Sequence, residues 1–405
     1  MWNPSLAPLE EEFNMSELDA LLIHGSQAFS KEELSRRAKK YGFSQPQILE
    51  LFAWDYELTA QLQTLSDDLV LKGGTAAQLY LPTEAQRGSV DIDLTTHLDE
   101  DELTQLISKM PRKFGAFTPL FQFKKYLPKA PKANVPMTTY DVLLPSAFQE
   151  NCSVKVDILT SRLSLPTVEM SDIETFAIKV SKAKIVSLGT LIGDKLLTLA
   201  KETIGIVSEE DYPKQIYDIE MLTFKRGKLT NDVIDRVAEA IEKIVLEEAR
   251  FRRIETSPTE VLKDVEKTME RYSLVDLAVG NPSAKRNINN FQQFYVNRRE
   301  MPTRLYEWSS RALRIKFLVT LMQSHLSGKI EASQVVQSIL RSREISSRIK
   351  EVRRENVAKL RGQLLAQAEG HIPSFKELMG KPLERVFWQI LTPDNIDRIA
   401  EFLGN

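Results

Sequence analysis

The chain has little of what would cross-link it, coordinate zinc or hold it in a membrane. It contains one cysteine, Cys152, in 405 residues, which excludes an internal disulfide and a cysteine-rich zinc site. Its four histidines show no metal-ligand spacing. No run approaches the roughly eighteen apolar residues of a membrane span, and the first residues lack the basic and then apolar pattern of a signal peptide. We therefore expect a cytoplasmic protein with no membrane partner.

Net charge is also nearly absent, with 54 Lys and Arg against 56 Asp and Glu. A hydrophobic content of 42% can form ordinary cores, and the length predicts two or three domains. Two stretches depart from the balance. Residues 111–132 interleave basic and aromatic residues without an acid, and residues 341–361 carry eight basic residues against three acids. Each stretch either binds a polyanion such as RNA or has a structural explanation. For 111–132 that explanation is a strand with a buried aromatic face and solvated lysines, and for 341–361 it is a solvated helix face.

Hydrophobic spacing predicts a helical start followed by alternating helices and strands. Ser30 is a candidate N-cap and Gly42 a candidate end for the first helix. The pattern predicts helices over 30–42, 45–65, 75–81 and 99–110, and strands over 69–71, 90–95, 121–126, 138–144 and 153–160. Residues 128–136 read as a loop.

The chain after Ser187 reads as helical to its end. The predicted helices cover 190–204, 213–224, 230–252, 257–272, 303–327, 331–368, 375–391 and 393–403, with a break at Gly280 and Asn281-Pro282. We predict an α+β fold with three domains. These are a helical segment over 1–45, a mixed sheet with flanking helices over 46–225, and a helical C-terminal domain over 226–405.

Residues 69–94, LVLKGGTAAQLYLPTEAQRGSVDIDL, contain the most informative pattern. A Gly73-Gly74 turn lets backbone N–H groups approach an anion at the start of a helix. Asp91 and Asp93 are two apart on a predicted strand, so both point to one face. Two converging carboxylates are costly unless a cation lies between them, and magnesium is usually held by one or two carboxylates plus substrate phosphates. The pattern indicates a site for a nucleoside triphosphate and its metal ion.

Each part of the pattern also has a plain structural interpretation. A Gly-Gly turn is structural in most proteins, and an isolated Asp-x-Asp is usually a solvated strand or turn. The combination at this spacing, with Arg87 and Ser89 between the two parts, favours the binding site. Arg87 either binds phosphate or anchors the loop.

This stretch resembles the nucleotidyltransferase signature of the polymerase-β superfamily. More narrowly, it is similar to the AbiEii (abortive infection) toxin family, including its MenT-type members. The family shows a KGGTAL-like turn followed by R-x-S-x-D-hydrophobic-D-L. Downstream it has an Asp-Lys-Leu-type helix and a segment ending in Tyr-Asp-Leu, which match Gly193–Leu197 (GDKLL) and Lys214–Ile219 (KQIYDI) here. The family often has Lys-Asp where this chain has Lys214-Gln215, so a second acid is missing.

The resemblance implies site residues at the matching positions, namely Ser89, Asp91, Asp93, Lys195 and Asp218. It implies that Asp91 and Asp93 hold Mg²⁺, with Mn²⁺ as an alternative, and that Lys195 contacts the triphosphate while Asp218 positions it. Asp157, where the wider superfamily places a third strand carboxylate, is either a general base or a solvated strand acid. The predicted nucleotide-binding residues are Lys72, Gly73, Gly74, Thr75, Arg87 and Ser89.

The resemblance further implies transfer of a nucleoside monophosphate from a nucleoside triphosphate to an acceptor hydroxyl. The acceptor would be the 3′ end of transfer RNA, and the protein would be the toxin of a toxin–antitoxin or phage-defence pair with a cognate antitoxin. Two alternatives stay open. One is transfer to a protein or small molecule, and the other is a nucleotide-binding module without turnover.

Overall fold

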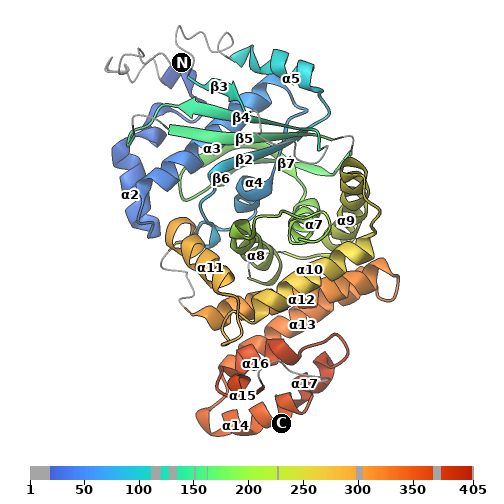
Figure 1. Cartoon of the computed structure of the whole chain (residues 1–405). Helices are drawn as coiled ribbons and strands as arrows, with labels where there is room; N and C mark the ends of the chain where they lie inside the picture. Colours follow the sequence, from blue (N-terminus) through green and yellow to red (C-terminus); the bar gives the residue numbers. More distant parts are fainter. Residues whose placement is uncertain are drawn as a thin grey trace. The chain divides into compact units, whose positions relative to one another are not determined.

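The computed structural model describes residues 19–110, 120–126, 135–149, 152–161, 163–225, 228–297, 304–367 and 375–403. The chain forms two compact units (Figure 1). The sheet unit comprises Met1–Val186 with Phe294–Glu300, and the helical unit comprises Ser187–Gln293 with Met301–Asn405. This division reflects packing, so the three domains predicted from the sequence stay a prediction. None of the helices in the described ranges combines the length and apolar character needed to cross a bilayer.

The sheet unit is built on seven strands. They are β1 (Val70–Lys72), β2 (Asp91–Thr96), β3 (Gln122–Lys125), β4 (Met137–Leu144), β5 (Cys152–Thr160), β6 (Thr167–Glu174) and β7 (Lys179–Val186). Their order is β3-β4-β5-β2-β1-β7-β6. β2 runs parallel to β5 and β1 runs parallel to β7, while the other neighbours are antiparallel. The mixed sheet, with the helical region that follows it, confirms the predicted α+β class.

Helices flank this sheet. They are α2 (Lys31–Tyr41), α3 (Pro46–Leu65), α4 (Gly73–Leu79) and α5 (Glu100–Ile107), with 3₁₀ turns at Ser26–Phe29 and Thr83–Ala85. The predicted caps of α2 are confirmed, because the Ser30 side chain accepts from the Glu33 N–H and Gly42 adopts a φ of 77°. α3 packs against β2, β5 and β7 and is buried on every side from Phe52 to Leu62. It is therefore the central helix of this unit.

The hairpin of β6 and β7 was not predicted. Most residues of β6 are exposed, and its sequence TVEMSDIE lacks the apolar alternation that marks a half-buried strand. The pairing of β6 with β7 holds it in place instead, with Thr167 opposite Val186 at one end and Glu174 opposite Lys179 at the other. Such a hairpin is stabilised by its partner strand, which a local pattern does not reveal.

The helical unit contains eleven helices in its described part. They are α7 (Leu188–Thr198), α8 (Tyr212–Glu220), α9 (Asn231–Arg252), α10 (Pro258–Ser273), α11 (Pro282–Tyr295), α12 (Leu305–Leu326), α13 (Ala332–Lys350), α14 (Val357–Leu365), α15 (Phe375–Leu378), α16 (Leu383–Ile390) and α17 (Ile396–Phe402). α8 continues into a π-helical turn at Met221–Lys225, and 3₁₀ turns lie at Glu209–Asp211 and Arg354–Asn356.

The predicted break at Gly280 and Asn281-Pro282 is present, because α10 ends at Ser273 and α11 begins only at Pro282, where proline suits the first turn of a helix. Helix α11 itself was not predicted, and two predicted helices are wrong in extent. The helix predicted over 331–368 divides into α13 and α14, and the one over 375–391 divides at Gly380 and Pro382 into α15 and α16. The basic stretch at 341–361 is therefore not one continuous helical face.

Candidate active site

Strand β2 presents the two predicted metal-binding aspartates on one face of the sheet. Ile92 and Leu94 are fully buried, while Asp91 and Asp93 between them are half-buried. The alternation follows from the two-residue period of a strand. Asp91 and Asp93 therefore project from the polar face, and their apolar neighbours anchor the strand in the core.

Strand register places further charged residues beside these aspartates. Asp93 lies opposite Lys72 of β1 and Asp157 of β5, and Asp91 lies opposite Lys155 of β5. Residues directly opposite each other on neighbouring strands share a face. The sheet thus gathers three predicted carboxylates and two lysines on one face, although Asp157 is more than sixty residues from Asp93 in the sequence.

Gly73 lies against the Asp93 carboxylate. Its φ is +69°, a left-handed conformation that favours glycine. A Cβ atom at this position would lie 1.9 Å from Oδ2 and 2.6 Å from Cγ of Asp93. Only glycine leaves room for that carboxylate, so Gly73 is required here both by backbone conformation and by space.

Gly74 makes the corresponding approach to the residues between the two parts of the motif. A Cβ atom on Gly74 would lie 2.9 Å from Oγ of Ser89 and 3.0 Å from Nη2 of Arg87. The side chains of Ser89, Arg87 and Asp93 therefore converge on the glycine pair. Helix α4 begins at Gly73 and has only seven residues. The candidate site is therefore defined by these converging side chains and not by the N-terminus of α4.

Arg87 and Thr75 are held inside the fold. Arg87 is 1% exposed, its backbone N–H donates to Gln78 Oε1 over 2.9 Å, and its Nη1 donates to the Gly88 carbonyl over 2.7 Å. Thr75 is fully buried, and its hydroxyl donates to the Asp91 carbonyl over 3.1 Å. These bonds match the anchoring interpretation of Arg87. The Thr75 hydrogen bond also holds α4 against β2, the strand that carries the aspartates.

Asp157 is bonded on both carboxylate oxygens. Oδ1 accepts from the Thr139 hydroxyl over 2.6 Å, and Oδ2 pairs with Lys155 Nζ over 2.7 Å. Loss of hydration lowers the pKa of Lys155, but Asp157, Asp91 and Asp93 outweigh it and the net shift is upward. Lys155 is thus a charged member of the site that the sequence did not single out. Its position two residues before Asp157 on the same strand was the available clue.

Asp55 on α3 was also missed. It is fully buried, its Oδ1 has no hydrogen-bond partner among the described residues, and its Oδ2 receives only a long contact of 3.4 Å from the Thr75 hydroxyl. Burial raises the pKa of Asp55 well above its ordinary value, and repulsion from Asp91 and Asp93 raises it further. No periodicity could identify it, because α3 is buried on every side.

These acids fit a divalent cation held jointly with substrate phosphates. Within the described ranges no group of three or more His, Cys, Asp or Glu side chains is arranged to enclose a metal. Asp91 and Asp93 nevertheless supply two hard oxygen donors on one face, and the repulsion felt by Asp55 reports concentrated negative charge. Mg²⁺ is commonly bound by one or two carboxylates and completed by phosphate oxygens and water. The donor set therefore suits Mg²⁺ and resembles no all-protein cage.

Lys195 and Asp218 form a buried ion pair inside the helical unit. Their Nζ and Oδ2 atoms are 2.7 Å apart, and the side chains are 2% and 0% exposed. Lys195 Nζ also donates to Gln215 Oε1 over 3.0 Å. Gln215 stands where the related motif often has an acid, so its amide oxygen supplies an uncharged second acceptor for this lysine.

Close helix packing positions that lysine. A Cβ atom on Gly189 of α7 would lie 2.6 Å from Cβ of Arg236, and one on Gly193 would lie 3.0 Å from Cβ of Ala240. Both partners belong to α9, so the two glycines bring α7 close against α9. Lys195 follows Gly193 by two residues and faces α8 from this fixed helix.

The aromatic and basic stretch at 111–132 lies largely outside the described residues. In the part that is described, Phe121 is buried against Trp54, Phe123 packs edge-on against Tyr140, and Lys125 pairs with Glu100. These contacts match a strand with packed aromatics and solvated lysines. They give no support to base stacking on Phe121 or Phe123.

Comparisons with known proteins found a family match and a distant structural similarity. A family model described as "Nucleotidyl transferase AbiEii toxin, Type IV TA system" matches residues 58–286, more than half of the chain. No curated protein matches the chain. A solved structure, an antigenic nucleotidyltransferase-like protein from Paracoccidioides brasiliensis, is 15% identical, with a TM-score of 0.31 over 51% of this chain and 94% of that chain.

Proposed function

The chain belongs to the AbiEii family of nucleotidyl transferase toxins of type IV toxin–antitoxin systems, and on this premise we propose the reaction that it catalyses. It transfers a nucleoside monophosphate from a nucleoside triphosphate to the 3′-terminal hydroxyl of transfer RNA. A blocked 3′ end cannot be aminoacylated, which would stop growth. A cognate antitoxin and action in the cytoplasm, including phage defence, belong to the same proposal.

The observation that carries this proposal is the crowding of the glycine pair by Asp93, Ser89 and Arg87. A Gly-Gly turn alone or an Asp-x-Asp strand alone is unremarkable. Here the two features lie against each other, since the Asp93 carboxylate occupies the space that a Gly73 side chain would need, and this closeness supports a single site. Backbone donors for phosphate and carboxylates for a cation are then adjacent, as nucleotidyl transfer requires.

Residues of this site would share the chemistry as follows. Asp91 and Asp93 would hold Mg²⁺ or Mn²⁺, and the bound ion would neutralise the triphosphate and activate the acceptor hydroxyl. Ser89 and the backbone of the Lys72–Thr75 turn would orient the phosphates, with Arg87 fixing the loop. By its match to the family motif, Lys195 of the helical unit, positioned by Asp218, would stabilise the charge that develops on the leaving pyrophosphate.

The reaction would need only the nucleoside triphosphate and the acceptor hydroxyl as reactants. The acceptor oxygen attacks the α-phosphorus, a new phosphorus–oxygen bond forms, and pyrophosphate leaves with the electron pair of the broken bond. Asp157 would take the hydroxyl proton as the general base. Thr139 and Lys155 would hold its carboxylate in position, because each contacts one of its oxygens.

The direct test is transfer of label from α-³²P nucleoside triphosphates in the presence of Mg²⁺ and total RNA. We expect label in transfer RNA with the wild type and a loss of at least about a hundredfold with Asp91→Asn or Asp93→Asn, as for removal of a metal ligand. Asp172→Asn is the matched control. Asp172 is exposed on the β6–β7 hairpin and has a φ of 57°, which asparagine tolerates.

Each other outcome selects a different function. Label in protein or in a small-molecule fraction would replace transfer RNA as the acceptor while keeping the chemistry. Tight triphosphate binding with no transfer to any fraction would identify a binding module without turnover. Equal transfer by the wild type and Asp91→Asn would refute the assignment of the site.

A further inference from the structure

The helical unit contains a cavity that the proposed reaction does not use. Its volume is about 530 Å³, and five basic and three acidic side chains line it. They come from the end of α8 with its π-helical turn and from α12, α13, α14 and α16. The volume falls within the range of ordinary small-molecule sites.

Two of the three acids in this cavity are already neutralised. Glu220 is fully buried and pairs with both Arg311 and Arg314. Glu384 accepts from Arg314 over 3.0 Å and from the Ser346 hydroxyl over 2.9 Å, and Lys350 lies 3.2 Å away. The pKa of each is lowered, because these cations outweigh the cost of burial.

The third acid, Glu307, neutralises little of the remaining positive charge. Burial raises the pKa of Glu307, and although Arg311 opposes that shift, the net change is upward. Glu307 forms no ion pair with any described residue within 4 Å. The lining therefore carries more positive charge than its acids balance.

Arg311 is the cation with unused hydrogen-bonding capacity. It is 4% exposed, and its Nη1 atom is buried without a hydrogen-bond partner in the described part of the chain. Its Nε lies 2.7 Å from Glu220 Oε2, which nevertheless lacks a well-aligned hydrogen bond. The rings of Trp308 and Tyr217, at 4.7 and 5.1 Å, flank the guanidinium and fix its plane. An unpaired buried donor on a fixed guanidinium is costly unless an acceptor enters the cavity.

Lys225 adds a second cation with no described partner. It forms no hydrogen bond or ion pair with the residues that the structure describes. Lys225 keeps an exposed surface, yet partial loss of hydration lowers its pKa, Glu220 opposes that shift, and Arg314 and Lys350 reinforce it. Neighbouring cations thus destabilise the charge on Lys225, and a bound anion would relieve that repulsion.

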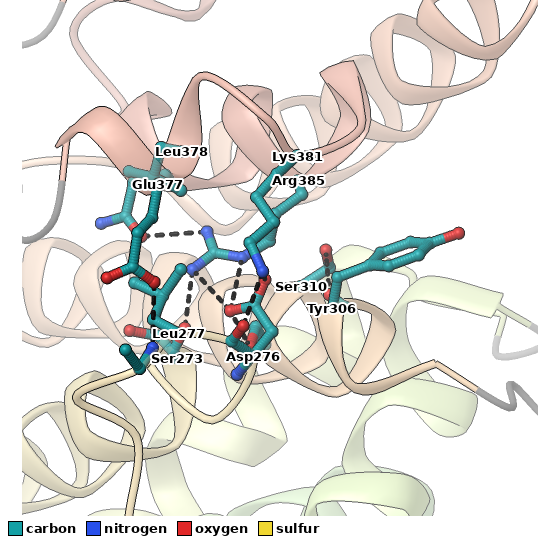
Figure 2. A network of polar contacts seen from close by, with 12 residues as sticks. Ser273, Asp276, Leu277, Tyr306, Ser310, Glu377, Leu378, Lys381 and Arg385 are labelled. Atoms are coloured by element: carbon teal, nitrogen blue, oxygen red, sulfur yellow. Dashed lines mark hydrogen bonds and ion pairs between the residues drawn. The ribbon is translucent and has the colours of Figure 1, made fainter.

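An adjacent network in the same unit pairs its cations with groups of the protein itself. Arg385 donates to the Ser273 carbonyl over 2.7 Å and pairs with Asp276, and Lys381 donates to the Asp276 carbonyl over 2.6 Å (Figure 2). The Tyr306 ring, which lines the cavity, points away from this network (Figure 2). The Asp276 network binds its cations internally, whereas the cavity leaves Arg311 and Lys225 available.

We propose that this cavity binds a small phosphate-bearing molecule, with Arg311 and Lys225 as the principal contacts. A planar guanidinium matches two phosphate oxygens, and an ammonium supplies a point charge beside it. The volume of the cavity suits pyrophosphate or a mononucleotide better than a length of RNA, which needs an extended track for its backbone. The site would be additional to the one on the sheet.

The test is calorimetric titration of the full chain with inorganic phosphate, pyrophosphate and ATP in metal-free buffer containing EDTA. We expect saturable binding of pyrophosphate or ATP that weakens as salt is added. Arg311→Lys keeps the charge and loses the fork, and Lys225→Met breaks no ion pair. Each should weaken binding by about tenfold, the loss of one charge-assisted contact.

Two controls assign the binding to this cavity. Lys267→Met makes the same change on the solvent-facing side of α10, where the lysine is exposed and pairs with Glu202, and this variant should bind like the wild type. Asp91→Asn should also bind normally, so the cavity is tested independently of the proposed reaction. Circular dichroism establishes that each variant is folded.

Three results would overturn the proposal. They are no binding of any probe by the folded wild type at millimolar concentration, unchanged binding by both Arg311→Lys and Lys225→Met, and binding that Asp91→Asn abolishes. Binding of a 5′-phosphorylated oligonucleotide without binding of pyrophosphate or ATP would replace the small molecule with a nucleic acid.

Discussion

Asp55 in the sheet unit and Glu220 in the helical unit are both fully buried carboxylates, yet their pKa values move in opposite directions. Burial raises the pKa of Asp55, and Asp91 and Asp93 raise it further. Burial also raises the pKa of Glu220, but Arg311 and Arg314 reverse the net shift. The cost of burial has the same sign at both positions, so the neighbouring charges decide the outcome.

This difference separates the chemistry of the two regions. The sheet unit gathers carboxylates around the glycine turn, and such a group is stabilised by a bound cation. The helical unit gathers arginines and lysines around a cavity, and that group is stabilised by an anion. The comparison can be tested by changing one charge or one contact at a time.

The largest effect is expected from breaking the Lys195–Asp218 pair. Lys195→Met or Asp218→Leu leaves one charge buried without its partner, which costs about 3–5 kcal/mol of the free energy of unfolding. The double variant removes both charges and should be more stable than either single one. Urea denaturation followed by circular dichroism measures all four proteins.

Lys214→Met on α8, the helix that carries Asp218, is the control for that pair. Lys214 is part-exposed and pairs with Asp211 within one helical turn, and ion pairs that keep contact with solvent contribute less than about 1 kcal/mol. If Lys195→Met were no more destabilising than Lys214→Met, the buried pair would have no special energetic role.

The next effect concerns the space at the glycine turn. Gly73 and Gly328 both have a φ of +69°, but an added Cβ meets the Asp93 carboxylate at Gly73 and nothing within 4 Å at Gly328. Gly328→Ala should cost about 1–2 kcal/mol from backbone conformation alone. Gly73→Ala should cost about 1–3 kcal/mol more from overlap and should abolish nucleotidyl transfer.

Thermal denaturation and the labelled-triphosphate assay compare these two alanine variants directly. Equal losses of stability, with transfer retained by Gly73→Ala, would show that the close approach to Asp93 is dispensable.

A smaller effect is expected in the pH dependence of stability. Because the pKa of folded Asp55 lies above the unfolded value of about 3.9, its contribution is complete below that value and is lost as pH rises towards the folded pKa. Asp55→Asn should remove this decline, which has a slope of at most about 1.4 kcal/mol per pH unit. Urea denaturation in metal-free buffer from pH 4 to 8 measures it.

Glu220→Gln should change the pH dependence of stability in the opposite direction in the same experiment. The folded pKa of Glu220 is lowered, so its contribution is present above the unfolded value and is lost as pH falls through the folded one. The variant should lose stability at neutral pH and flatten the acid side of the profile. If stability changed with pH in the same way in Asp55→Asn and Glu220→Gln, the opposite pKa shifts of the two carboxylates would be contradicted.

The smallest effect leaves stability unchanged and concerns the one cysteine. Burial raises the pKa of Cys152 to about 11, and Glu50 and Asp55 contribute to the shift. Alkylation of the folded protein at pH 8 should be at least about a hundredfold slower than in urea, because the thiolate is the reactive form. Rapid labelling without urea would show that this part of the sheet unit opens readily.

Local patterns predicted much of the fold and part of the candidate site. The caps of α2, the alternation of β2 and the continuous helices of the C-terminal region depend on residues close together in sequence. The hairpin of β6 and β7 was missed because pairing stabilises it, and α13 and α14 were merged because their apolar spacing continues across the break. Asp55, Lys155, Arg311 and Lys225 gain their significance from neighbours that are distant in the chain.

The sequence by itself determined the family, the α+β class and the order of the glycine turn and the aspartates, because each is encoded over a few dozen residues. Only the tertiary structure decided that Asp93 fills the space beside Gly73 and that Lys195 is buried with Asp218 and Gln215. It also decided the opposite electrostatic characters of the two units. Space, burial and the Coulomb interactions of side chains depend on distances through the folded molecule, and residue types alone do not specify those distances.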